Sequence, residues 1–335
     1  MMNQLRITNC KLQVVGFLRL MVDRATMDYR LWTIVFLLTT TFAHSQQNIV
    51  TAQYLYNGLL INPAYAGSHV QLSATLTYRN QWVNFDGAPV TATLGVHSSF
   101  YKGKVGLGAL VTSDRIGSYT NTGAFASYAY IIQTASGGSF SMGVQVGANN
   151  YKADFSALKL RSGADPSFVN NSEIKPNVGT GIFYYDKKKF IGLSVPGLIS
   201  YDRLFNNSLQ PLYVPRYYYL NAGVRLRVNP RSDKVMLTPS VLVRVQDGTP
   251  VSMDFNLNLI FDEQVSIGTS YRTGDGITTF ANLRITDKLS VGYFYDWITS
   301  DVRSYSRGSH ELMLNFRTRI KKVHKDLDCP HLFSH

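Results

Sequence analysis

Apolar and polar residues alternate with a period of two along most of this chain. The clearest stretch is 251–262, VSMDFNLNLIFD, where apolar residues fill the odd positions from Val251 to Phe261 and polar residues fill the even ones, except for Ile260. Successive side chains of a β-strand point to opposite faces of a sheet, so this alternation predicts strands with one apolar and one polar face. The same alternation occupies 217–228, 289–297 and 310–319.

The strands predicted in this way are long. We expect about fourteen of them, near 69–81, 89–101, 104–114, 119–133, 138–151, 175–185, 188–196, 214–229, 234–246, 250–262, 264–273, 276–286, 288–299 and 307–319. Strands of soluble proteins usually have about 5–6 residues, whereas a tilted strand that crosses a bilayer needs about 9–11. The lengths therefore favour strands that cross a membrane over a soluble β-sandwich, which would also alternate.

The connections between these strands fall into two classes of length. Numbered from the first strand, the even connections are all short: Lys102-Gly103, Ser136-Gly137, Asp186-Lys187, 229–233, Glu263 and Asp287. The long connections, 152–174, 197–213 and 300–306, are all odd. A barrel with an even number of strands and periplasmic termini has short periplasmic turns and longer outer loops. The sequence therefore predicts an all-β fold, a transmembrane antiparallel β-barrel with both termini in the periplasm.

Charged residues are scarce and lie on one face of the predicted strands. They make up 16% of the chain, against about 25% in a typical soluble domain. Because lipid offers no hydrogen-bond partners, a sheet in the membrane must close, and a charge on its lipid face would cost about 2–4 kcal/mol at mid-membrane. The polar face should therefore line the lumen, together with Arg79, Arg225, Arg244, Arg272, Arg284 and Arg317.

The stretch 27–45, MDYRLWTIVFLLTTTFAHS, has the pattern of a signal peptide. Arg30 precedes an apolar run at 31–42, which is too short for an ordinary membrane helix. Small residues at the −3 and −1 positions predict cleavage before Gln46 and export to the outer membrane. An uncleaved N-terminal anchor is the alternative.

The remaining chain divides around the predicted barrel. Residues 1–26 do not fit a signal peptide, and we take Met27 as the true start, so that 1–45 are absent from the mature protein. We expect a periplasmic N-terminal segment at 46–67, the barrel at 68–319 and a basic periplasmic tail at 320–335.

The chain is basic overall. Its formal net charge is +12 and falls to +9 without residues 1–45. A basic balance can reflect nucleic acid, anionic lipid or an acidic partner. The basic residues are spread singly along alternating positions and do not cluster with aromatic residues, so we expect no nucleic acid. Acidic surfaces on a protein partner fit this charge better.

Three adjacent residues near the outer start of the last strand have the residue types of a catalytic triad. They are Ser309, His310 and Glu311. A triad is defined by its arrangement in space, so adjacency in the sequence is weak evidence for one. Hydrogen bonding at the start of a strand is the simpler interpretation. We expect no catalysis, with a hydrolase at the barrel rim as the alternative.

The tail contains residue types that bind metals. His324, Cys329, His331 and His335 are present, but their spacing matches no closed zinc site. The other cysteine of the chain precedes the predicted cleavage site, so no internal disulfide is expected in the mature protein. We expect no metal and no cofactor, and the role of Cys329 stays open.

Several short motifs lie between these features. They are QY at 53–54, NGLLINPAYAGS at 57–68, YRNQW at 78–82, FDGAPV at 85–90, GY at 292–293 with YD at 295–296, GSHELML at 308–314, and CPH at 329–331 followed by Phe333. Together they resemble the PorP/SprF family of outer-membrane proteins, which belong to the type IX secretion and gliding system. The resemblance extends over essentially the whole chain after the predicted signal.

The resemblance singles out residues whose role is structural or in partner binding. They are Asn62, Pro63, Ala64, Tyr65, Gly67, Arg79, Gln81, Trp82, Gly87, Pro89, Gly308, Ser309, His310 and Glu311. The motif around Asn62-Pro63 cannot continue a strand and favours a turn. Its apolar residues need cover, so we hypothesise that 46–67 fold into the periplasmic end of the barrel and partly plug it. A plain lead-in segment is the alternative.

The resemblance also implies a role. It implies a non-enzymatic barrel that binds, anchors or helps to secrete cargo with a C-terminal sorting domain, such as surface adhesins. The implied partners are other type IX secretion components, including a peptidoglycan-binding periplasmic lipoprotein, and the lipid of the outer membrane. An outer-membrane channel for small or hydrophobic solutes is the alternative.

Overall fold

The computed structural model describes residues 52–69, 72–135, 137–156, 170–201, 214–247, 249–274, 276–298 and 308–318. The predicted signal peptide with its cleavage site, and the tail 320–335 with Cys329, lie outside these residues. So do parts of the long connections, at 157–169, 202–213 and 299–307.

The described strands form one antiparallel sheet. They are β1 (Leu72–Asn80), β2 (Val90–Phe100), β3 (Val105–Ile116), β4 (Tyr119–Gln133), β5 (Ser139–Ala153), β6 (Asn171–Tyr185), β7 (Lys189–Val195), β8 (Tyr217–Val224), β9 (Leu226–Asn229), β10 (Ser232–Gln246), β11 (Ser252–Phe261), β12 (Val265–Arg272), β13 (Gly276–Arg284), β14 (Leu289–Ile298) and β15 (Ser309–Thr318). Three 3₁₀-helices precede them, η1 (Ala52–Leu55), η2 (Gly58–Leu60) and η3 (Pro63–Tyr65).

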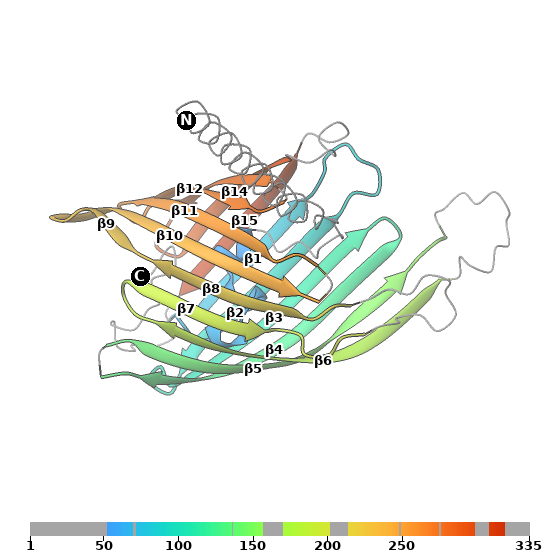
Figure 1. The fold of residues 1–335 in the computed structure, drawn as a ribbon, viewed down its shortest axis with the longest axis horizontal. Helices are drawn as coiled ribbons and strands as arrows, with labels where there is room; N and C mark the ends of the chain where they lie inside the picture. The colour runs from blue at the N-terminus through green and yellow to red at the C-terminus, as the bar shows by residue number, and fades with distance from the viewer. Residues whose placement is uncertain are drawn as a thin grey trace, which may run out of the picture. The chain divides into compact units, whose positions relative to one another are not determined.

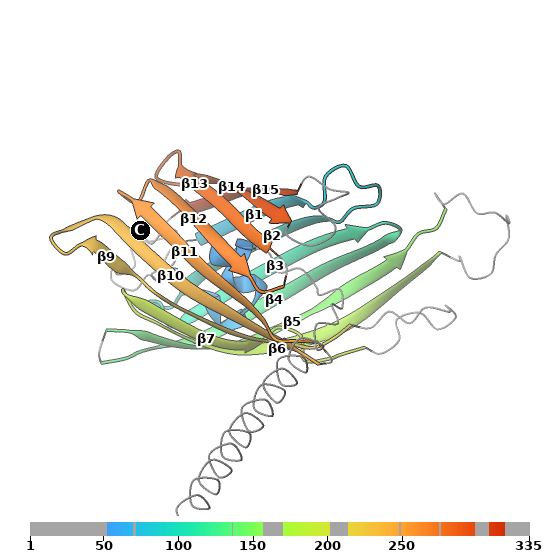
Figure 2. The same cartoon turned by 45° about the horizontal axis from the view of Figure 1, so that its top comes forward.

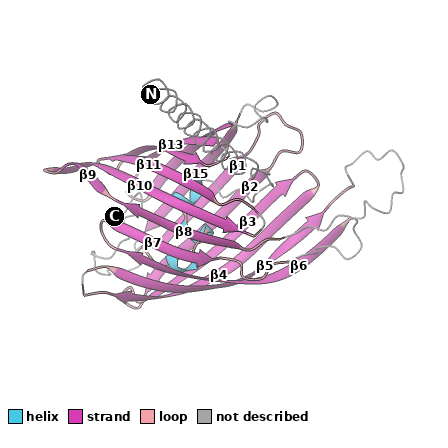
Figure 3. Ribbon diagram, viewed as in Figure 1, coloured by secondary structure: helices cyan, strands magenta, loops and turns pink. Residues whose placement is uncertain are grey.

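The sheet closes on itself as a barrel (Figures 1 and 3). Strand β1 pairs with both β2 and β15, and β10 pairs with both β8 and β11. Strands β8 and β9 both pair with β10 and are interrupted only at Arg225, so they form one crossing of the wall. The barrel therefore has fourteen strands, and the prediction of a closed antiparallel barrel of about that size is confirmed.

Two predicted strand boundaries differ from the structure for a physical reason. Strands β5 and β6 have fifteen residues each, and β6 begins at Asn171, four residues before the predicted strand. Their paired ends next to the long connection, 149–153 and 171–175, carry polar side chains on both faces. The alternation therefore fades there, although the ladder of backbone hydrogen bonds continues.

The two faces of the wall have opposite character. Large apolar side chains cover the outer face, among them Leu76, Leu94, Val144, Leu257 and Leu312, which are 40–55% exposed. Polar side chains such as Thr77, Asn256 and Asn258 lie on the inner face and are at least 95% buried. Within the described ranges, no helix is long and apolar enough to cross a bilayer.

Candidate functional site

Residues 52–69, here called the lumen segment, have an irregular backbone with three short 3₁₀-helices. Asn62 caps η3, since its extended backbone precedes the helix and its Oδ1 accepts a 2.9 Å hydrogen bond from the Ala64 N–H. Pro63 follows at the first helical position, where its missing N–H leaves no hydrogen bond unmade. The Asn-Pro motif thus begins a helical turn.

The lumen segment lies inside the barrel (Figure 2). Leu59, Ala64 and Ala66 are fully buried, although the three short 3₁₀-helices of this segment are the only helices among the described residues. Helix η3 contacts β4, β5 and β6, and η2 contacts β3. The segment therefore gains its burial from the inner face of the wall.

Apolar side chains of the wall meet the first half of the segment. One buried cluster joins Ala52, Tyr54, Leu55, Tyr56 and Ile61 to Tyr219, Met236, Leu242, Ile260, Phe280, Phe294 and Met313. The Tyr56 ring lies edge-on to the rings of Phe280 and Phe294, at centroid distances of 6.2 and 5.6 Å. Such edge-to-face pairs add about 0.5–1.5 kcal/mol to the burial of the rings.

Several members of this cluster are the residues that break the polar pattern of the inner face. Ile260 is the exception in the alternation of 251–262, and Phe294 lies among the polar residues of 289–297. Both are 1% exposed and pack in the cluster with Tyr56. These apolar exceptions on the polar face are the sequence signal for contact with the lumen segment. The alternation alone did not identify them as contact residues.

Inward-facing glycines make room for the second half of the segment. A Cβ atom on Gly106 would overlap the carbonyl oxygen of Ala66, and one on Gly143 would overlap the backbone of Ala64. A Cβ atom on Gly181 would likewise overlap the side chain of Asn62. The backbone of the segment therefore lies directly against the wall at these strands, in space that a larger residue would fill.

Hydrogen bonds tie the same half of the segment to β5, β6 and β7. Asn62 Nδ2 donates to the Ile182 carbonyl oxygen at 3.0 Å. Ser141 donates to the Ala64 carbonyl oxygen at 2.7 Å, and Ser194 donates to that of Ile61 at 2.6 Å. The two serine bonds satisfy backbone carbonyls of the segment, whose irregular backbone gives them no regular ladder partner.

Two tyrosines of the segment bond the opposite wall. Asn256 Nδ2 donates to the Tyr54 hydroxyl at 2.6 Å, and the Tyr56 hydroxyl lies 3.2 Å from Ser266 Oγ. Burial raises the pKa of Tyr54 well above its ordinary value, and the nearby carboxylate of Asp254 adds to the rise. Burial also raises the pKa of Tyr56. Both phenols therefore stay neutral, as a buried hydroxyl must.

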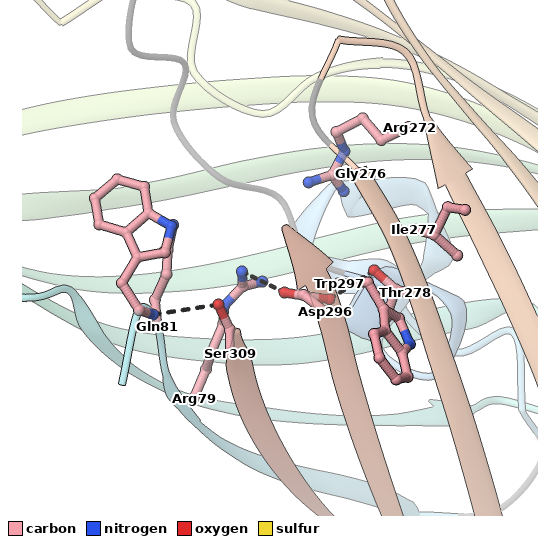
Figure 4. Close-up of a pocket in the computed structure, with 10 residues that line it drawn as sticks. Arg79, Gln81, Arg272, Gly276, Ile277, Thr278, Asp296, Trp297 and Ser309 are labelled. Atoms are coloured by element: carbon pink, nitrogen blue, oxygen red, sulfur yellow. Dashed lines mark hydrogen bonds and ion pairs between the residues drawn. The ribbon is translucent and has the colours of Figure 1, made fainter. Parts of the chain in front are cut away.

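A row of ion pairs follows the inner wall toward the long connections. Arg79 Nη2 lies 2.6 Å from Asp296 Oδ2, and Thr278 donates to the other oxygen of this carboxylate at 2.6 Å (Figure 4). Arg272 binds both oxygens of Asp254, at 2.8 and 2.9 Å. Bidentate pairs of this kind fix geometry as well as charge. A cavity of about 30 Å³ is lined by Arg79 and Asp296 and also by Arg272.

The structure brings together the signature residues at the ends of β1 and β15 that lie on the side of the long connections. The Trp82 N–H donates to Ser309 Oγ at 3.3 Å, and the Val83 N–H donates to the Gly308 carbonyl oxygen at 3.1 Å. Within the loop, the Gln81 N–H donates to the Pro89 carbonyl oxygen at 3.0 Å. The Gly87 carbonyl oxygen accepts from the Gly117 N–H at 2.9 Å, so the loop also rests on the β3–β4 turn. This group is separate from Asn62, Pro63, Ala64, Tyr65 and Gly67, which lie in the lumen segment.

The three residues with triad-like types do not converge. Ser309 and Glu311 are buried on the inner face of β15. His310 lies between them on the outer face, where its Nδ1 is 2.5 Å from the Tyr293 hydroxyl. Adjacent strand residues point to opposite faces, so this histidine cannot act as a base toward Ser309.

Metal-binding residue types do not gather in the part of the barrel that the structure describes. No three His, Cys, Asp or Glu residues there lie close enough to hold an ion. The tail residues His324, Cys329, His331 and His335 lie outside the described residues.

A closed antiparallel barrel with an apolar outer face and a polar inner face has the features of the class of outer-membrane β-barrels. The family described as "Type IX secretion system membrane protein PorP/SprF" matches residues 43–316, which is most of the chain. The chain belongs to this family, and the resemblance inferred from the motifs is confirmed. PorP/SprF is a secretion-system family, not an enzyme family, and membership implies work with other secretion components.

Other comparisons give distant structural likeness. A comparison with curated proteins finds no match. Among solved structures, "KdgM porin in complex with disordered oligogalacturonate" is 10% identical, with 73% of this chain and 98% of that chain covered and a TM-score of 0.35. A porin mutant of Rh. blastica is 7% identical, with 74% and 99% covered and a TM-score of 0.34.

Proposed function

We propose that this barrel is a binding and anchoring component of type IX secretion and that it does not conduct solutes. The observation that supports this most is the lumen segment, which packs against the wall from β3 to β15 and is bonded to both sides of it. A solute channel needs an open lumen lined by polar groups. The apolar side chains and hydrogen-bonded backbone of the lumen segment instead lie buried against the inner wall.

The proposal includes an orientation. The short turns and both ends of the mature chain face the periplasm, after cleavage before Gln46, and the long connections face outward. On this view 46–67 form a plug, 68–319 the barrel and 320–335 a periplasmic tail. Cargo with a C-terminal sorting domain, such as an adhesin, is held at the outer side. A peptidoglycan-binding lipoprotein is the expected periplasmic partner, and no catalysis or cofactor is involved.

Reconstitution in planar bilayers tests the central point. We expect no steady conductance from the full-length protein, and substantial conductance from a variant without residues 46–67. A steady, substrate-dependent conductance of the unaltered protein would instead support a channel for small or hydrophobic solutes.

A second experiment tests cargo binding. Each long connection is exchanged in turn for a short turn, and the retention of secreted cargo at the cell surface is measured. We expect at least one exchange to release cargo while the barrel stays in the outer membrane. Unchanged retention in every variant would contradict binding through these connections.

A further inference from the structure

Strand β9 has one edge that none of the described strands covers. Among the described residues it pairs with β10 alone, whereas β8 pairs with both β7 and β10. The last bond on the β7 side runs from the Arg225 N–H to the Lys188 carbonyl oxygen, at 2.6 Å. Beyond this bond, the free edge of β9 offers backbone donors and acceptors that have no ladder partner among the described strands. Such an edge is a template for another strand.

The β9–β10 hairpin, residues 226–235, extends past the ends of the neighbouring strands, on the left of Figures 1 and 2. Strand β10 pairs with β11 only from Val235 onward. All four residues of β9 are exposed. The hairpin is therefore accessible from the side of its free edge.

The two faces of the hairpin differ in character. Leu226 and Val228 lie on one face and are 48% and 56% exposed. Arg227 lies on the other face, where it pairs with Asp233 across the hairpin. Successive side chains of an added strand would lie on the two faces in turn. Its apolar residues would then lie beside Leu226 and Val228, and its acidic residues would lie beside Arg227.

The hairpin tip carries positive charge that its own residues do not neutralise. Within the part of the chain that the structure describes, no ion pair involves Arg231 or Lys234. The β6–β7 turn lies beside the free edge and adds Lys187, Lys188 and Lys189.

The whole end of the barrel that carries the short turns is basic. Its described residues include twelve Lys and Arg against five Asp and Glu: Lys102, Lys104, Lys187, Lys188, Lys189, Arg225, Arg227, Arg231, Lys234, Arg284, Lys288 and Arg317 against Asp186, Asp233, Asp262, Glu263 and Asp287. Toward the long connections, seven basic residues face eight acidic ones: Arg79, Arg115, Lys152, Lys175, Arg216, Arg244 and Arg272 against Asp86, Asp114, Asp154, Glu173, Asp247, Asp254, Asp296 and Glu311. The net charges are therefore +7 and −1, so the basic balance of the described barrel is concentrated where β9 is exposed.

We propose that the β9–β10 hairpin is a docking site for an acidic, extended polypeptide segment that adds to the free edge of β9 as a strand. The backbone edge supplies hydrogen bonds, while Arg231, Lys234 and the lysines of the β6–β7 turn attract the acidic residues. The exposed Leu226 and Val228 contact the apolar residues of the alternating partner. The proposal concerns the hairpin itself and holds whichever side of the membrane the short turns face.

The test uses the full-length protein in detergent and a fluorescent eight-residue peptide of alternating glutamate and valine. Fluorescence anisotropy measures binding to the unaltered protein and to the double variant Arg231→Glu/Lys234→Glu. We expect the variant to bind at least about tenfold more weakly, because both substitutions reverse charges next to the peptide. Neither side chain takes part in a described ion pair, so the barrel should keep its fold, as its thermal transition will report.

Two controls separate strand addition from general attraction. The variant Lys102→Glu/Lys104→Glu reverses charges on the same rim, at the β2–β3 turn, and should bind within about twofold of the unaltered protein. A peptide methylated on alternate backbone nitrogens keeps its charge but loses edge donors, and should not bind. Equal binding of the methylated peptide, or equal loss in both double variants, would overturn the proposal. Binding of phosphatidylglycerol vesicles without binding of the peptide would also overturn it, in favour of a lipid-facing role.

Discussion

Asn62 donates a 3.0 Å hydrogen bond to the carbonyl oxygen of Ile182, a residue 120 positions later in β6. The Oδ1 atom of the same side chain accepts a hydrogen bond from the Ala64 N–H. A single side chain therefore both shapes the lumen segment and attaches it to the wall. Gly181 leaves the space in which this side chain lies.

Replacement of Asn62 by alanine should loosen the lumen segment. It removes the helix cap and the bond to Ile182, and a lost buried hydrogen bond of this kind costs about 1–3 kcal/mol. We expect a lower thermal transition and faster proteolysis within 52–69. Asn150→Ala is the matched control, because Asn150 accepts a bond from Ser172 at the exposed end of β5. Equal effects of both substitutions would argue against a special role for Asn62.

Replacement of Gly106 by valine should displace the segment from β3. Its Cβ would overlap the Ala66 carbonyl oxygen, which belongs to backbone and cannot turn aside. Overpacking of this kind costs about 1–3 kcal/mol. In planar bilayers we expect open-channel events that the unaltered protein lacks. Ala109→Val places the same valine side chain on the outer face of β3 and should leave the recordings unchanged.

Loss of Arg79 should destabilise the wall more than loss of the whole ion pair. The Arg79 and Asp296 side chains are 6% and 23% exposed, so Arg79→Ala leaves a partly buried carboxylate without its cation. Such a change costs about 3–5 kcal/mol in a buried setting. The double variant Arg79→Ala/Asp296→Ala should recover part of that loss. Denaturant unfolding, followed by the fluorescence of Trp82 and Trp297, measures the difference. A double variant as unstable as the sum of the single variants would contradict this coupling.

High pH should release the lumen segment. Burial raises the pKa of Tyr54 and Tyr56 above the ordinary 10.0, so each phenol binds its proton more tightly in the bound segment than in a released one. The contribution of these tyrosines to the stability of the bound segment is complete below pH 10.0. It declines as the pH rises past that value, because only the released phenols ionise there. Proteolysis within 52–69, measured between about pH 8 and 11, should accelerate at the alkaline end. The double variant Tyr54→Phe/Tyr56→Phe should show less acceleration, and an unchanged profile would rule out this cause.

The wall could be predicted from the sequence because lipid and lumen impose opposite demands on neighbouring residues. Val251 to Phe261 alternate for this reason, and the ladder of β11 follows directly. The same rule explains why the structure places His310 on the face opposite Ser309 and Glu311.

The path of the lumen segment could not be predicted in this way. Its residues have no period of two or of 3.6, and their partners lie far away in the sequence, as Tyr54 and Asn256 do at a separation of 202 positions. What the sequence did contain was indirect, namely apolar residues such as Ile260 and Phe294 at positions where the polar face was expected.

The lumen segment precedes every strand in the chain, yet it packs against side chains as distant as Met313 in β15. A segment made before every strand therefore completes its contacts last, because those contacts require a wall that has already come together. Contacts of such long range slow folding. In each new molecule, the docking of this segment should accordingly follow closure of the wall and be the last step of folding.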